Sequence, residues 1–134
     1  MPKGALLHCH FGATVDMPKL IEIALETPLM SIRIGRHFPP GIECIKMHRT
    51  LDLPTPYFLL KKDDSADLSK CSSLFDSEYN TKEWIPIRLA RDNFPAHLGG
   101  SKGFDQWVYK TLTIDPVEAY QTHSTVTKAT LFQL

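Results

Sequence analysis

The hydrophobic pattern at the start of the chain predicts a short strand followed by a helix. Residues 4–10 form a small, apolar run that ends in histidine, and Gly12 closes it. Asp16 is placed to cap a helix, and Pro18 falls in the first turn, where its missing backbone N–H costs little. The apolar positions that follow recur at helical spacing and form one face: Met17, Leu20, Ile21, Ala24 and Leu25. Because Pro28 stops this pattern, the order is strand, tight connection and helix, as in the first unit of a β/α repeat.

The middle of the chain has a less regular pattern. Polar and apolar residues alternate with a period of two over residues 31–35, which predicts a strand. Residues 42–48 and 55–61 are two further strand candidates, and the sequence Pro-Pro-Gly at 39–41 predicts a turn before the first of them. Residues 63–80 are polar and rich in Ser and Asp, so we expect a surface loop there.

A helical pattern returns in the last third of the chain. The sequence Leu-Gly-Gly-Ser at 98–101 indicates a break, and residues 104–112 then have the spacing of a short amphipathic helix. A second helix is predicted from Asp115, with Pro116 at its first position and Glu118 able to reach back to the cap. We expect this helix to run to about residue 128.

The composition is that of one modest globular domain. Hydrophobic residues make up 43% of the 134 positions, and the formal net charge at pH 7 is zero. There is no basic stripe to indicate a nucleic-acid partner, and no charge run or apolar stretch of roughly 18 residues to indicate a membrane partner. The apolar run at 5–7 is far shorter than the roughly 7–15 residues at the centre of a signal peptide. The three cysteines are widely spaced and form no CxxC pair, so we expect reduced thiols and a cytoplasmic location, although a longer parent protein would be free to be secreted.

The histidine pair His8 and His10 is the first candidate site. Residues i and i+2 of a strand project to the same face, so both imidazoles would point together while Cys9 turns away. Two neutral imidazoles can share one zinc ion at about 2.0–2.1 Å. At the C-terminal end of a strand they would lie at the mouth of a barrel, where β/α enzymes keep their chemistry. The pattern predicts part of a Zn²⁺ site, and ordinary strand histidines remain the alternative.

Other conspicuous residues have simpler interpretations. His37 and His48 flank the proline-rich turn and are expected to be exposed, and His123 is expected to be an ordinary helix histidine. Trp84 and Trp107 are expected to pack between elements.

Two stretches carry a family resemblance. MPKGALLHCHFGATVD, at residues 1–16, resembles the first strand of the adenosine deaminase-like metal-dependent hydrolases, and most of all the adenosine deaminase-related growth factor branch. The stretch WIPIRLARDNFPAHLGGSKGFDQWVYKTLTIDPVEAYQTHSTVTK, which begins at Trp84, resembles the fungal-type members. The two matches are collinear and together span the chain to about residue 128.

The resemblance implies a TIM-type (β/α)₈ barrel and a zinc-dependent deaminase. In that family the metal is held by the HxH pair, a third histidine and an aspartate, and zinc-bound hydroxide attacks C6 of adenosine and releases ammonia. Carried over residue by residue, only His8 and His10 map onto metal ligands. The resemblance also makes Trp84 a candidate contact for a purine nucleoside, beside its packing role.

The length of the chain limits what it can contain. A complete barrel needs about 250 residues, so residues 1–134 are expected to be one N-terminal portion of an adenosine deaminase-like domain, with a loop-rich insertion at about 36–100 and an incomplete α/β barrel. Phe11 and Gly12 stand where the family commonly has an aspartate that contacts ribose. The remaining metal ligands and proton-transfer groups would lie beyond Leu134.

Two functions therefore remain open. In the first, the chain is a fragment of a zinc-dependent adenosine deaminase and is inactive by itself, because two imidazoles lack the other ligand and the acid–base groups. In the second, it is a non-catalytic binding or interaction module that retains only the metal half-site. In both, the exposed edge of an incomplete sheet offers a route to self-association.

Overall fold

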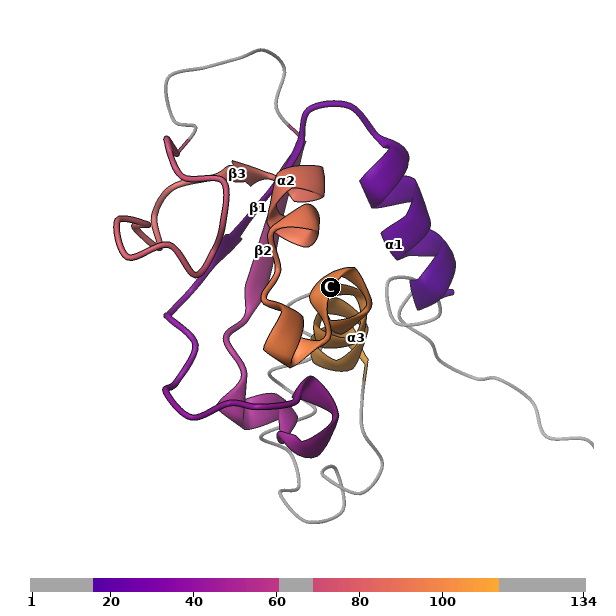
Figure 1. The fold of residues 1–134 in the computed structure, drawn as a ribbon. Coiled ribbons are helices and arrows are strands. Elements are labelled where there is room, and N and C mark those ends of the chain that lie inside the picture. The colour runs from indigo at the N-terminus through magenta and orange to yellow at the C-terminus, as the bar shows by residue number, and fades with distance from the viewer. Residues whose placement is uncertain (1–15, 61–68, 114–134) are drawn as a thin grey trace, which may run out of the picture.

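A small antiparallel sheet with three helices on one of its faces forms the centre of the fold (Figure 1). The computed structural model describes residues 16–60 and 69–113. Strands β1 (Met30–Ile34), β2 (Pro56–Leu60) and β3 (Ile85–Pro86) are arranged in the order β2-β1-β3, and both pairings are antiparallel. The helices are α1 (Met17–Glu26), α2 (Ile87–Asp92) and α3 (Gly100–Leu112).

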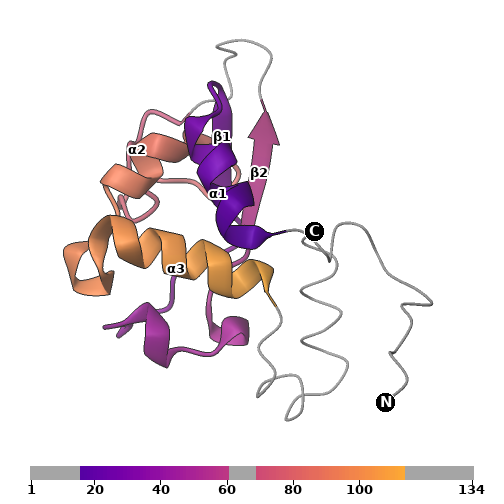
Figure 2. The same cartoon turned by 90° about the vertical axis from the view of Figure 1, so that its right-hand side faces the viewer.

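Short 3₁₀ turns join these elements, at Ile45–Met47, Thr50–Asp52 and Ala96–Leu98. The views in Figures 1 and 2 show α1, α2 and α3 gathered on the same side of the sheet, with α3 running beneath α1 and α2. The turns of residues 69–83 lie on the opposite side (Figure 1). The sheet therefore has a helix-covered face and an outer face that only turns approach.

Helix α1 forms as its sequence predicts. The Asp16 side chain accepts a hydrogen bond from the Lys19 backbone N–H at 3.3 Å, which satisfies one of the free donors of the first turn. At the other end, the Thr27 N–H and hydroxyl both donate to the Ile23 carbonyl oxygen, at 2.9 and 2.6 Å. Leu29 then adopts a φ of 64°, in the left-handed region, and turns the chain into β1.

The register of the strands shows which side chains face the helices and which lie on the outer face. Ile32 of β1 lies opposite Phe58 of β2 and Ile85 of β3, and Ile32 and Ile85 are fully buried beneath the helices. Neighbouring positions point to the outer face, where Arg33 lies opposite Tyr57. The predicted strands at 31–35 and 55–61 are thus confirmed as β1, which lies one residue earlier than predicted, and β2, which begins one residue later.

An aromatic cluster fills the core beside α3. Phe94, Phe104 and Trp107 pack with ring centroids 5.6–5.9 Å apart, and the half-buried Phe38 and Phe75 complete the cluster. The Trp107 indole N–H donates to the Pro54 carbonyl oxygen at 3.0 Å, so the buried ring leaves no polar atom unsatisfied. The expected packing role of Trp107 is confirmed.

Some local predictions were wrong. Residues 42–48 are not a strand, because Ile42 and Ile45 are both buried while Met47 is 85% exposed, a spacing that suits the observed 3₁₀ turn and not a period of two. Helix α3 begins at Gly100 and not at residue 104, so the two glycines start the helix where a break was predicted. Strand β3 and helix α2 lie within the segment predicted to be loop-rich.

The barrel prediction depends on parts of the chain outside the described residues. The predicted strand at 4–10 and the predicted helix at 115–128 both lie there. Within residues 16–60 and 69–113 the sheet is antiparallel, whereas a barrel is built from parallel strands. The barrel therefore stays a prediction.

Candidate functional site

The predicted zinc ligands, His8 and His10, lie outside the described residues. Residues 16–60 and 69–113 contain no group of three or more His, Cys, Asp or Glu side chains that could hold a metal ion. His37 is exposed, as predicted, and its ring meets the edge of Tyr79 at 6.4 Å. The same prediction was wrong for His48, which is half-buried, with Nδ1 2.6 Å from the Cys44 carbonyl oxygen. The described part of the chain thus holds no separate metal site of three or more such ligands.

Trp84, the candidate nucleoside contact, lies immediately before β3. It is half-buried, and its carbonyl oxygen accepts a hydrogen bond from the Ser69 N–H at 2.8 Å. Its ring centroid is 5.3 Å from Cζ of Arg33. Trp84 therefore packs between elements, as expected, and its ring is beside a cation on the outer face of the sheet.

Arg33 and Tyr57 complete this outer-face cluster. Cζ of Arg33 lies 4.4 Å from the centroid of the Tyr57 ring, so the guanidinium is next to two aromatic rings at once. The local pattern of β1 indicates that Arg33 faces away from the buried isoleucines. Its two aromatic neighbours come from distant segments, so no local pattern in the sequence predicts the cluster.

Tyr79 is 3% exposed, and its phenol is close enough to Arg33 to feel the charge of the guanidinium. Its hydroxyl donates to the Glu83 carbonyl oxygen at 2.9 Å. Burial raises the pKa of the Tyr79 phenol, while a hydrogen bond with the backbone of Ile34 and the charge of Arg33 act in the opposite direction. The phenol is therefore held in its neutral form, which suits a structural hydrogen bond and not proton transfer near neutral pH.

An apolar cavity of about 150 Å³ lies on the helix-covered face, between α1, the sheet and the end of α3. Its walls are entirely apolar: Leu20, Ile21, Ala24, Met30, Phe58, Ile87, Val108 and Leu112. Such walls offer no hydrogen bond with which to orient a substrate, and no acid or base. The cavity can accept apolar groups but carries no catalytic chemistry.

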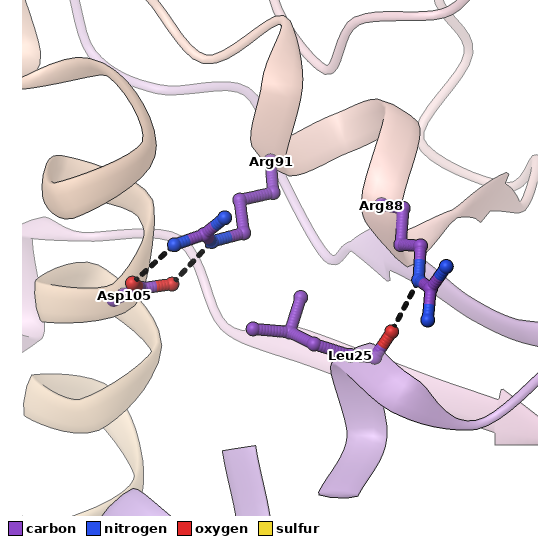
Figure 3. Close-up of polar contacts among 4 residues, drawn as sticks. All are labelled: Leu25, Arg88, Arg91 and Asp105. Carbon is purple, nitrogen blue, oxygen red and sulfur yellow. Dashed lines mark hydrogen bonds and ion pairs between the residues drawn. The ribbon is translucent and has the colours of Figure 1, made fainter. Parts of the chain in front are cut away.

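Two arginines of α2 link the three helices (Figure 3). Arg91 forms two parallel bonds with the Asp105 carboxylate of α3, both at 2.9 Å, and the pair raises the pKa of Arg91. Arg88 points toward the end of α1, where its Nε donates to the Leu25 carbonyl oxygen at 2.5 Å. Both guanidinium groups are already bonded within the protein, so this region is a structural junction.

The same region borders a second, more open cavity that includes Glu22, Gln106 and Tyr109. Arg91 and Asp105, whose side chains are 32% and 35% exposed, also line this cavity, and Glu22 is paired there with Lys19. Among the described helices, none has both the length and the apolar character that a membrane crossing requires.

Comparison with known proteins identifies no relative. No family model, no curated protein and no solved structure matches the chain. The function must therefore be argued from the residues and their arrangement.

Proposed function

We propose that the chain is the N-terminal part of a zinc-dependent deaminase of the adenosine deaminase-like family, whose complete form acts on a purine nucleoside. His8 and His10 would supply half of the Zn²⁺ site. Two collinear stretches carry the proposal, one containing this histidine pair and one beginning at Trp84. They are far apart in the sequence, so together they are a more specific signal than the histidine pair alone.

The packing of the helices supports treating the two stretches as parts of one unit. Asp16, the last residue of the first stretch, caps α1. Residues of the second stretch form β3, α2 and α3, and α1 packs against both helices. The bond from Arg88 to the Leu25 carbonyl joins α2 to the end of α1 (Figure 3). Contacts of this kind are expected if the two stretches belong to one domain.

The chain by itself is expected to be inactive. Catalytic zinc sites generally have three protein ligands and an open position for water, and deamination also needs groups that move protons. Of the residues that the resemblance assigns to these roles, only His8 and His10 are in the chain. Zinc, once held by a complete set, would supply a hydroxide near neutral pH. Trp84 is retained as a proposed nucleoside contact.

The experiment is zinc analysis and an ammonia-release assay with adenosine on the purified 134-residue chain. The proposal expects weak zinc binding, lost in the double variant His8→Ala/His10→Ala and retained in the matched control His37→Ala/His97→Ala. It also expects no turnover. Equal zinc binding by both double variants would show that His8 and His10 are not zinc ligands. Stoichiometric zinc with ammonia release would show that the chain completes a site of its own, and the fragment proposal would then be wrong.

A second candidate function is a non-catalytic interaction module. Within the described residues β2 is an edge strand, and it exposes Tyr57, Leu59 and Leu60 by 42%, 41% and 58%. An edge strand with exposed apolar residues and no charge is a template for pairing with another chain. Self-association through β2 is therefore the form that this function would take.

Sedimentation velocity over a range of concentrations tests the second candidate. If the chain self-associates through β2, we expect a reversible dimer. The double variant Leu59→Lys/Leu60→Lys should abolish this dimer, because charge on an edge strand opposes pairing. Leu89→Lys, at a 44% exposed position of α2, is the matched control and should leave the dimer intact. A monomer at every concentration would contradict self-association.

A further inference from the structure

A row of three side chains crosses the outer face of the sheet. The register of β1 and β2 places Arg33 directly opposite Tyr57. Trp84 immediately precedes β3, and Ile85 of β3 is the partner of Ile32, so Trp84 lies beside Arg33. We call this set the Tyr57–Arg33–Trp84 row. Its members come from three separate segments, and only the pairing of the strands brings them together.

The two rings hold the guanidinium from both sides. Cζ of Arg33 is 4.4 Å from the centroid of Tyr57 and 5.3 Å from that of Trp84. A guanidinium is planar and weakly hydrated, so aromatic faces stabilise it and restrict its rotamers. Arg33 is thus a half-buried cation that is held in position before any ligand arrives.

The described part of the chain leaves most of the N–H donors of Arg33 without an acceptor. Within residues 16–60 and 69–113, its one hydrogen bond goes from Nη1 to the Thr81 carbonyl oxygen at 3.5 Å, which is long for a hydrogen bond. In the described ranges the ion pairs are Lys19–Glu22 and Arg91–Asp105, so no described carboxylate neutralises Arg33. A half-buried cation in this state gains most from an anion that can accept its remaining donors.

Three other arginines differ from Arg33 in the length of their hydrogen bonds. Arg91 holds a carboxylate with two 2.9 Å bonds, Arg88 donates to Leu25, and Arg36 donates to the Leu51 carbonyl oxygen at 3.0 Å. Each of these has a short bond to a protein acceptor. Arg33 combines partial burial and aromatic neighbours with a single long bond to a described residue.

On the β2 side, the surface beside Arg33 includes two exposed, largely apolar side chains. Tyr57 and Leu59 alternate onto the same outer face and are 42% and 41% exposed. Ser31, on the same face of the central strand, is only 2% exposed. A ligand can therefore approach Arg33 over β2, where it would meet a ring and an aliphatic side chain.

We propose that the Tyr57–Arg33–Trp84 row binds an oxyanion, a carboxylate or a phosphate, that is carried on a planar ring. Arg33 takes the oxyanion through its planar fork of donors, and the ring lies over Tyr57 and Leu59. This site does not depend on the zinc half-site, and its test requires no metal.

Titration followed by ¹H–¹⁵N NMR tests the site. The probes are benzoate, phenyl phosphate and the uncharged benzamide, and the signals to follow are the Trp84 indole N–H and the Arg33 Nε–H. We expect saturable shifts with both anions and affinity at least about tenfold lower for benzamide. The relative affinities for benzoate and phenyl phosphate then identify which oxyanion the site prefers.

Variants separate the role of Arg33 from general surface binding. Arg33→Met keeps an apolar stem between the rings and should lower the affinity for the anions by about tenfold or more. Arg36→Met is the matched control and should bind like the wild type. Arg33→Lys keeps the charge without the planar fork and should give an intermediate affinity, which preserves the test if Arg33→Met fails to fold. Binding that is equal for benzamide, unchanged in the Arg33 variants or not saturable would overturn the proposal.

Discussion

Gly103 is the position where α3 meets the preceding turn most closely. A Cβ atom there would lie 1.9 Å from the Leu98 carbonyl oxygen and 3.4 Å from Cε1 of Phe94. The first contact is with backbone, which cannot move aside as a flexible side chain can. The close approach of α3 to the turn therefore requires a residue without a side chain.

We expect Gly103→Ala to lower the free energy of unfolding by about 3 kcal/mol, because the added methyl group forces α3 away from the turn. Urea denaturation followed by circular dichroism measures the change. Lys102→Ala, at the exposed neighbouring position, is the control and should change the stability by less than about 0.5 kcal/mol. Equal stability of the two variants would show that the turn relaxes at no cost.

Tyr79 makes the stability depend on alkaline pH. Burial raises the pKa of its phenol, so the folded chain holds this proton more tightly than the unfolded chain does. This contribution to stability is complete below the unfolded pKa of about 10 and is lost as the pH rises through the folded pKa. Unfolding measured between about pH 9 and 11 should show stability falling with pH.

Tyr79→Phe should make that fall smaller, because the titrating group is gone. At neutral pH the variant should be less stable by about 1 kcal/mol, since the hydrogen bond to the Glu83 carbonyl oxygen is lost. An unchanged alkaline slope in the variant would assign the pH dependence to other groups.

At the scale of elements, the local sequence predicts a helix or strand correctly where the residues that define it all lie in one segment. Helix α1 has its cap, its proline in the first turn and its apolar face within ten residues of its own sequence. Strands β1 and β2 were also predicted from local patterns. The 3₁₀ turn at Ile45–Met47 was mistaken for a strand because a few apolar residues fit either period. The two-residue strand β3 is too short to give a pattern of its own.

We expect Asp16→Ala to lower the free energy of unfolding by about 0.5–1 kcal/mol, because the Lys19 N–H loses its acceptor at the start of α1. Asp16→Asn keeps a side-chain oxygen and should lose only a few tenths of a kcal/mol. Thermal unfolding of the two variants beside the wild type measures the difference. A loss of equal size in both variants would mean that charge, and not capping, accounts for the effect.

At the scale of the whole molecule, Trp107 connects segments that are distant in the sequence. Its indole N–H bonds to the Pro54 carbonyl oxygen across 53 positions, and its ring meets Phe38, Phe94 and Phe104. The contacts join α3 to the segment before β2 and to the segment after β1. Stability at this scale depends on one shared aromatic core.

We expect Trp107→Phe to lower the free energy of unfolding by about 2–3 kcal/mol, because it leaves a cavity and an unpaired carbonyl in the core. Trp84→Phe, at the half-buried position next to Arg33, should cost less than about 1 kcal/mol. Denaturant unfolding of the two variants gives the comparison. If Trp84→Phe cost as much as Trp107→Phe, the outer-face row would be a main source of stability.

The sequence by itself determined those features that depend on neighbouring residues. These are the capped helix α1, the alternating strand β1, the strand β2, and the histidine pair with its collinear second stretch, on which the functional proposal depends. Only the tertiary structure decided the order β2-β1-β3, the start of α3 at Gly100 and the meeting of Arg33 with Tyr57 and Trp84. The physical reason is that strand pairing and close packing are chosen by contacts between distant segments, and no local period encodes which segments will meet.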